Sequence, residues 1–100
     1  PSALIAYNDL VAIGIMDAIR AAGLQVGKDI AVIGYDNIPE ATNQPVPLTS
    51  VSTPASKLGE MVGQALQSWS FDRTDTANPL DITYPPRLII RESCGGARNE

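Results

Sequence analysis

The fold is decided by residues 3–37, ALIAYNDLVAIGIMDAIRAAGLQVGKDIAVIGYDN. This stretch begins and ends with short apolar runs, Ala3–Tyr7 and Ile30–Tyr35, which are typical of strands buried on both faces of a parallel sheet. Between them, Leu10–Ala22 carries apolar residues at helical spacing, and Gly23 follows where a helix C-cap is expected. Together these signals predict a strand–helix–strand unit with parallel strands, and so an α/β fold.

The remaining sequence predicts one more helix and shorter strands. The helix is expected to start at Ser52–Pro54, where a hydroxyl cap is followed by a proline at the first helical position. We expect Trp69 to complete its apolar face and to pack in a core. The other predicted segments are an irregular loop at Pro39–Pro47, a strand at Leu48–Val51, a loop at Ser70–Asn78, and strands at Asp81–Tyr84 and Arg87–Arg91.

Composition limits the functions that this segment can have. The 100 residues are 44% hydrophobic and 18% charged, which is ordinary for one globular domain. The net charge of -4 and the scattered basic residues do not favour binding to a phosphate backbone. Any contact with DNA is therefore expected from another segment. The chain enters a strand-like run directly, so we expect no signal peptide and a piece of a longer protein.

The sequence offers no catalytic, cofactor or metal motif. It has no histidine, which removes the commonest general base and metal ligand, and no nucleophile or phosphate-loop motif. Cys94 is the only cysteine, so no internal disulfide can form, and a reducing cytoplasm is the expected location. No apolar run approaches the roughly 20 residues that a membrane span needs.

Asn8 and Asp36 are the candidate ligand-binding residues. Each follows a predicted parallel strand, and ligands of open α/β sheets bind beyond the carboxyl ends of the strands. An amide and a carboxylate together suit the hydroxyls of a sugar or the N–H groups of a base. The alternative is local: Asn8 only caps the helix, and Asp36 only forms an Asx turn.

Three neighbouring residues are expected to be structural. We expect Asp9 to favour the start of the helix through the helix dipole rather than to contact a ligand. Tyr35 ends an apolar strand and is expected in the core or behind the ligand contacts. Gly34 is isolated and is expected to mark a packing contact.

Four separated motifs resemble the C-terminal part of LacI/GalR transcriptional regulators, over residues 1–93. They are A-x-N-D-x-x-A-x-G at Ala6–Gly14, I-x-V-I-G-Y-D-N at Ile30–Asn37, P-L-T-S-V at Pro47–Val51 and P-P-R-L-I-x-R at Pro85–Arg91. The resemblance implies a three-layer parallel-sheet sandwich lobe of the periplasmic-binding-protein-like type I fold, present as a partial domain. It assigns residues 1–52 and 85–96 to the C-terminal lobe. Residues 54–84 would dock on an N-terminal lobe that the chain lacks.

The resemblance also implies function. It assigns effector contacts to Asn8 and Asp36, and a homodimer interface to Val11–Arg20 and Glu40–Pro45. The effector would be a sugar or a nucleobase-like molecule, and DNA would be bound only through the missing N-terminal domain. This sequence lacks the Arg and aromatic effector contacts of the family, so the effector is left open.

Two other functions remain as alternatives. A periplasmic sugar-binding protein of a transport system shares the fold and an N-D-x-x-A-x-G pattern, although the P-L-T-S-V and P-P-R-L-I motifs favour the regulator. An enzyme on a similar scaffold, such as a hydrolase, is disfavoured by the missing histidine and nucleophile motif.

Overall fold

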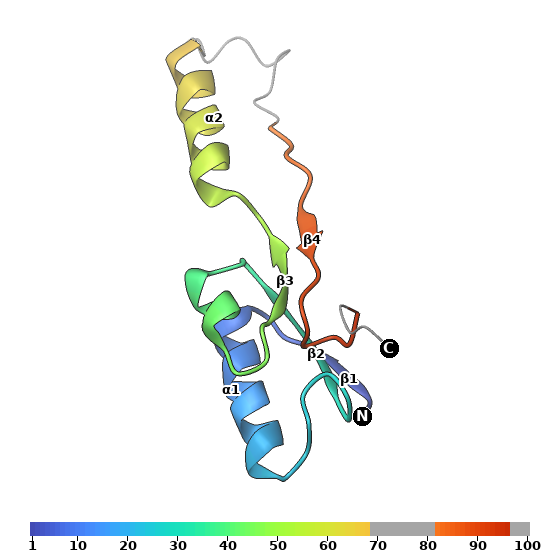
Figure 1. Ribbon diagram of the computed structural model, residues 1–100. Helices are drawn as coiled ribbons and strands as arrows, with labels where there is room; N and C mark the ends of the chain where they lie inside the picture. Colours follow the sequence, from blue (N-terminus) through green and yellow to red (C-terminus); the bar gives the residue numbers. More distant parts are fainter. Residues whose placement is uncertain (69–81, 97–100) are drawn as a thin grey trace. The chain divides into compact units, whose positions relative to one another are not determined.

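The computed structural model describes residues 1–68 and 82–96. Its elements are β1 (Ala3–Ile5), α1 (Asp9–Ala21), β2 (Ala31–Tyr35), the 3-10 helix η1 (Pro39–Asn43), β3 (Thr49–Ser52), α2 (Ala55–Ser68) and β4 (Arg87–Ile89) (Figure 1). The chain divides into two compact units, Pro1–Thr53 with Pro86–Glu100, and Pro54–Pro85. No helix in the described ranges is long and apolar enough to cross a membrane.

The first unit is built on one four-stranded sheet in the order β1-β2-β3-β4. β1 pairs with β2, and β2 with β3, in parallel, whereas β4 runs antiparallel to β3. The predicted α/β class and the parallel strand–helix–strand unit are therefore confirmed. The antiparallel β4 makes the sheet mostly rather than wholly parallel.

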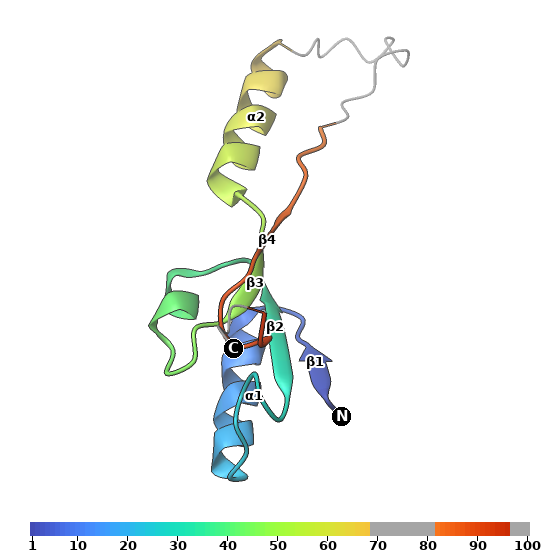
Figure 2. The same cartoon turned by 45° about the vertical axis from the view of Figure 1, so that its right-hand side comes forward.

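α1 lies along one face of the sheet (Figure 2), and the core lies between the two. Met16 of α1, Val32 of β2 and Leu48 before β3 have no exposed surface. Burying a side chain of this size stabilises the fold by roughly 1.5–3 kcal/mol. The helix is closed as predicted, because Gly23 has a φ of 79° and its N–H donates to the Arg20 carbonyl at 2.9 Å.

The other face of the sheet carries exposed apolar side chains. Pairing places Ile5 beside Ile33 on this face, and the alternation of β3 and β4 places Leu88 there as well. Ile5 is 84% exposed and Leu88 54% exposed. Within the described residues of this unit, helix covers one face of the sheet, and the second helix layer of the expected sandwich would lie over these residues.

Two segment predictions are corrected. Pro39–Pro47 is not irregular throughout, because η1 forms where Pro39 presets the first helical φ and Ala41 is buried. The predicted strand Asp81–Tyr84 is not formed at residues 82–84, which adopt no regular structure. The following Pro85 and Pro86 have no N–H to donate to a ladder, so the strand begins only at Arg87.

The second unit contains α2. α2 begins at Ala55, one residue after the predicted first helical position Pro54, whose carbonyl accepts a hydrogen bond from the Leu58 N–H at 2.9 Å. Leu58, Met61 and Val62 are half-buried on the predicted apolar face. Trp69 and the predicted loop Ser70–Asn78 lie outside the described residues.

Candidate functional site

Asn8 and Asp36 line one cavity. Asn8 follows β1 and Asp36 follows β2, and the two strands are parallel, so both residues emerge at the same edge of the sheet. The cavity has a volume of about 410 Å³, within the range of small-molecule sites, and its lining also includes Tyr7 and Tyr35. The two residues singled out in the sequence are thus brought together at one concave surface.

Asn8 caps α1 and faces the cavity at the same time. Its backbone is extended, and its Oδ1 accepts a hydrogen bond from the Val11 N–H at 2.9 Å. This bond fixes the orientation of the amide, and the structure records no hydrogen bond from the Asn8 NH2 group to any described residue. The capping interpretation is therefore correct, but it still leaves two donors for a ligand.

Asp36 is exposed, and its carboxylate has no protein partner among the described residues. Its backbone N–H donates to the Val51 carbonyl at 2.9 Å, which ties the residue to β3. The alternative that Asp36 serves an Asx turn is not supported by a side-chain hydrogen bond in the described structure. Both carboxylate oxygens are available as acceptors.

The two tyrosines depart from the sequence analysis. Tyr35 was expected in the core or behind the ligand contacts, but it is 40% exposed and lines the cavity. Tyr7 was expected in a buried strand, yet β1 ends at Ile5 and Tyr7 is 88% exposed. The sequence signal for both is their position, since each directly precedes one of the polar residues at a strand end.

Asp9 is a buried tether. It has no exposed surface, its Oδ1 accepts from Ser50 Oγ at 2.6 Å, and its Oδ2 accepts from the Ile38 N–H at 2.8 Å. It thereby joins the start of α1 to β3 and to the loop after β2. It makes no contact with the cavity, in agreement with its expected structural role. Its long-range bonds could not be read from the helix-start pattern.

Arg91 is a further residue near the site that sequence reasoning missed. Its Nη2 donates to Asn37 Oδ1 at 2.7 Å, and its Nη1 donates to the Leu48 carbonyl at 2.7 Å. Asn37 directly follows Asp36, so this arginine contacts the same turn. No sequence signal at Arg91 points to a partner so distant in the chain.

The site offers hydrogen-bond donors, acceptors and aromatic surface. In the part of the chain that the structure describes, no three His, Cys, Asp or Glu side chains gather as metal ligands would. Asn8 supplies donors, Asp36 supplies charged acceptors, and the two tyrosine rings supply flat apolar faces. The arrangement can bind a polar ring-shaped molecule.

Comparison with known proteins gives consistent matches. The model of the periplasmic binding protein-like domain family matches residues 1–94. The arabinose metabolism transcriptional repressor of Geobacillus stearothermophilus is 37% identical over 93% of this chain and 25% of its own length.

Two solved structures are similar in fold as well. The lac repressor dimer bound to operator and the anti-inducer ONPF has a TM-score of 0.77 and 32% identity, over 94% of this chain and 28% of that one. The transcriptional regulator CelR in complex with cellobiose has a TM-score of 0.78 and 32% identity, over 92% of this chain and 28% of that one. The chain spans about a quarter of the length of these proteins.

Proposed function

Since the chain belongs to the periplasmic-binding-protein-like domain family, in the branch of the LacI/GalR transcriptional regulators, we propose that it is the ligand-sensing and dimerisation portion of such a regulator. The observation that carries the proposal is the shared cavity of Asn8 and Asp36 at the carboxyl ends of two parallel strands. The effector is a sugar or a similar small polar molecule. It binds in a cleft that a second lobe, outside this chain, completes.

A sugar fits the chemistry of the cavity. Adjacent hydroxyls can donate to the Asp36 carboxylate and accept from the Asn8 NH2 group. The C–H face of a pyranose or furanose ring can lie on the exposed ring of Tyr7 or Tyr35. The CelR–cellobiose complex provides a sugar-bound relative of the same fold.

We assign residues 1–52 and 85–96 to the C-terminal lobe and residues 54–84 to a segment that docks on the N-terminal lobe. This assignment is supported by the division of the chain into compact units, whose boundaries fall at Thr53/Pro54 and at Pro85/Pro86. The half-buried apolar face of α2 is the surface that such docking would cover.

The dimer is proposed to form through Val11–Arg20 of α1 and Glu40–Pro45. Val11 is 47% exposed, and Leu10 beside it is 69% exposed, so α1 has apolar surface on the side away from the core. A relative of the same fold is a dimer on its operator.

In this proposal the effector favours one arrangement of the two lobes, and the dimer passes the difference to a DNA-binding segment outside the 100 residues. Such coupling requires different effector affinities in the two states, typically worth about 1–3 kcal/mol. A transport function has no specific support, because the three relatives named above are repressors and regulators by their names.

A thermal-shift screen of the complete protein tests the proposal. The probes are L-arabinose, D-ribose, D-glucose and cellobiose, with adenine representing the nucleobases. One of them should raise the unfolding temperature in proportion to RT ln(1 + [L]/Kd), and the shift should disappear in Asp36→Ala. A shift that survives both Asp36→Ala and Asn8→Ala would refute the assigned site, and turnover of the bound sugar would indicate an enzyme instead.

A further inference from the structure

The turn that carries Asp36 has an unusual backbone conformation. Asp36 has a φ of 107° and Asn37 a φ of 55°, in the region that residues with a Cβ rarely adopt. Two successive residues of this kind persist only where the surroundings hold them. The groups that hold the turn therefore decide where the Asp36 carboxylate lies.

The backbone of the turn is tied on one side to β3 and α1. The Asp36 N–H donates to the Val51 carbonyl at 2.9 Å, and the Asn37 N–H donates to Ser50 Oγ at 3.0 Å. The next N–H, that of Ile38, donates to the buried Asp9 carboxylate at 2.8 Å. These bonds pair the three successive N–H groups but leave the Asn37 side chain to be fixed by another group.

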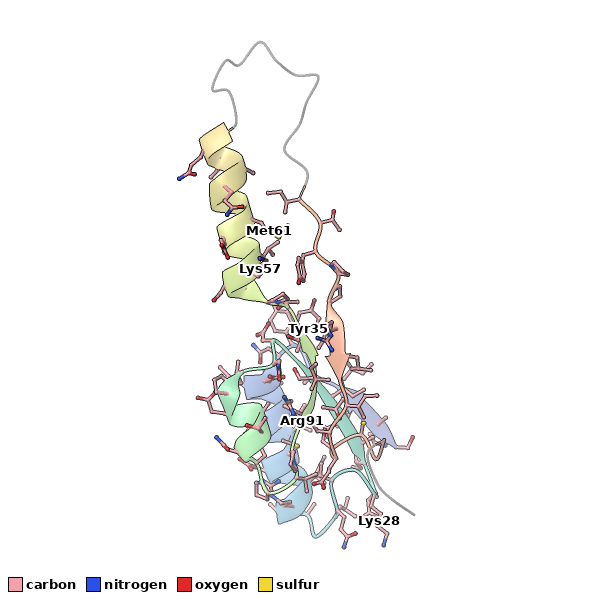
Figure 3. The ribbon with its side chains drawn as sticks, turned by 45° about the horizontal axis from the view of Figure 1, so that its top comes forward. Lys28, Tyr35, Lys57, Met61 and Arg91 are labelled. Atoms are coloured by element: carbon pink, nitrogen blue, oxygen red, sulfur yellow. The ribbon has the colours of Figure 1, made fainter. Side chains whose placement is uncertain are left out.

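Arg91 is that group. It follows β4 (Figure 3) and is half-buried. Its side chain spans from the Leu48 carbonyl to Asn37 Oδ1, with 2.7 Å to each. Its own backbone N–H donates to Thr49 Oγ1 at 2.8 Å, which anchors the residue beside the start of β3. Hydrogen bonds from a charged donor are shorter and stronger than neutral ones. The guanidinium thus links the Asn37 side chain to the Leu48 carbonyl, directly before β3.

We propose that Arg91 is a positioning residue of the effector site, which acts through Asn37 to keep the Asp36 carboxylate aimed into the cavity. Arg91 does not line that cavity, whose described lining is Tyr7, Asn8, Tyr35 and Asp36. The two bonds come from different nitrogens of one planar fork, a geometry that lysine cannot reproduce. The predicted effect on effector affinity rests on the proposed function, whereas the effect on the turn does not.

The Arg91–Asn37 hydrogen bond also joins two segments that are far apart in the chain. Arg91 lies just after β4, the strand on which the chain re-enters the first unit at Pro86. The turn on the other side of the contact carries the proposed effector acceptor. A side-chain bond therefore connects the segment where the chain re-enters the first unit to the turn at Asp36 and Asn37.

Hydrogen exchange on the complete protein tests the local part of the inference. In Arg91→Lys and Arg91→Ala, amide exchange in residues 36–40 should rise about tenfold, while exchange in the core of α1 stays unchanged. Arg87→Ala is the matched control, because Arg87 is an exposed arginine of β4 whose side chain has no hydrogen-bond partner among the described residues. Unchanged exchange at residues 36–40 in both Arg91 variants would overturn the inference.

Effector affinity tests the functional part, and the ligand is whichever of the five probes of the thermal-shift screen stabilises the wild-type protein. Arg91→Ala and Asn37→Ala should each weaken binding about tenfold, and the double variant should be no weaker than either, because both remove one interaction. Additive losses, or unchanged affinity in Arg91→Ala, would overturn the role in the site. If none of the five probes binds the wild type, the proposed function fails, and the exchange measurement still decides whether Arg91 holds the turn.

Asn37→Gly distinguishes control of the turn from a general loss of stability. Glycine adopts a φ near 55° without strain, so Asn37→Gly should bind the sugar more tightly than Asn37→Ala, although both lack the Arg91 partner. Equal affinities in these two variants would count against control of the site through the backbone of the turn.

Discussion

The Asp9 carboxylate fills the space where residue 34 would carry a side chain. A Cβ built on Gly34 would overlap Asp9 Oδ1, and it would also lie 3.0 Å from Leu48 Cδ2. Asp9 cannot move aside without losing its bonds to Ser50 Oγ and to the Ile38 N–H. A glycine at position 34 is therefore required by the carboxylate of Asp9 at the start of α1.

Gly34→Ala should destabilise the protein by about 3 kcal/mol, because an inserted methyl group meets a carboxylate held by two hydrogen bonds. Thermal unfolding of the complete protein measures the effect. Gly63→Ala in α2 is the control, since a Cβ there has nothing within 4 Å. Equal unfolding temperatures for Gly34→Ala and the wild type would show that the Asp9 carboxylate is free to move.

Asp9→Ala should destabilise the protein by about 3 kcal/mol, because it leaves the Ser50 hydroxyl and the Ile38 N–H unpaired in a buried place. Asp9→Asn keeps one acceptor and should lose less. The exposed Glu60 of α2 provides the control variant Glu60→Ala, which we expect to change stability by less than about 0.5 kcal/mol. If both Asp9 variants unfold at the same temperature as Glu60→Ala, the hydrogen bonds of Asp9 contribute nothing to stability.

The elements that the sequence predicts well are those with local signals. The helix expected at Leu10–Ala22 is observed at Asp9–Ala21, because its apolar spacing, Asn8 cap and Gly23 cap all lie within or beside it. The parallel strands follow from the two apolar runs and the helix between them. The placement of Asn8 and Asp36 at one rim follows in turn from parallel strands.

The features that the sequence did not predict depend on contacts between residues that are distant in the chain. Ser50 bonds Asp9 across 41 positions and Arg91 bonds Asn37 across 54, and no local pattern in a single sequence marks such partners. Tyr35 was misjudged for a related reason. Its strand is apolar, but the exposure of a strand's last residue is set by the loops that cover the sheet edge.

Asp36→Gly should separate stability from binding. Glycine relieves the positive φ of 107°, so the variant should be as stable as the wild type or more stable by about 1 kcal/mol. It also removes both acceptors, and sugar affinity should fall by about 2 kcal/mol or more. Calorimetry and thermal unfolding measured on the same samples test both effects. Retained affinity would remove Asp36 from the site.

Tyr7→Ala should weaken sugar binding by about 1 kcal/mol through loss of an aromatic face, with little effect on stability, because the side chain is 88% exposed. Tyr7→Phe keeps the ring and should bind almost as the wild type does. A loss in Tyr7→Phe as large as that in Tyr7→Ala would instead assign the contribution to the hydroxyl group.

Val11→Asp should shift the complete protein from dimer to monomer. Val11 belongs to the proposed interface and is 47% exposed, so the aspartate is tolerated in the monomer but is desolvated without a partner when two copies associate. Leu24→Asp is the matched control, because Leu24 is 42% exposed and lies beyond the end of α1, outside the proposed interface. Analytical ultracentrifugation over a range of concentrations measures both association constants. If the proposed interface is correct, the Val11 variant dissociates at concentrations where the Leu24 variant and the wild type remain dimeric. Equal association constants for all three proteins would place the dimer contact elsewhere.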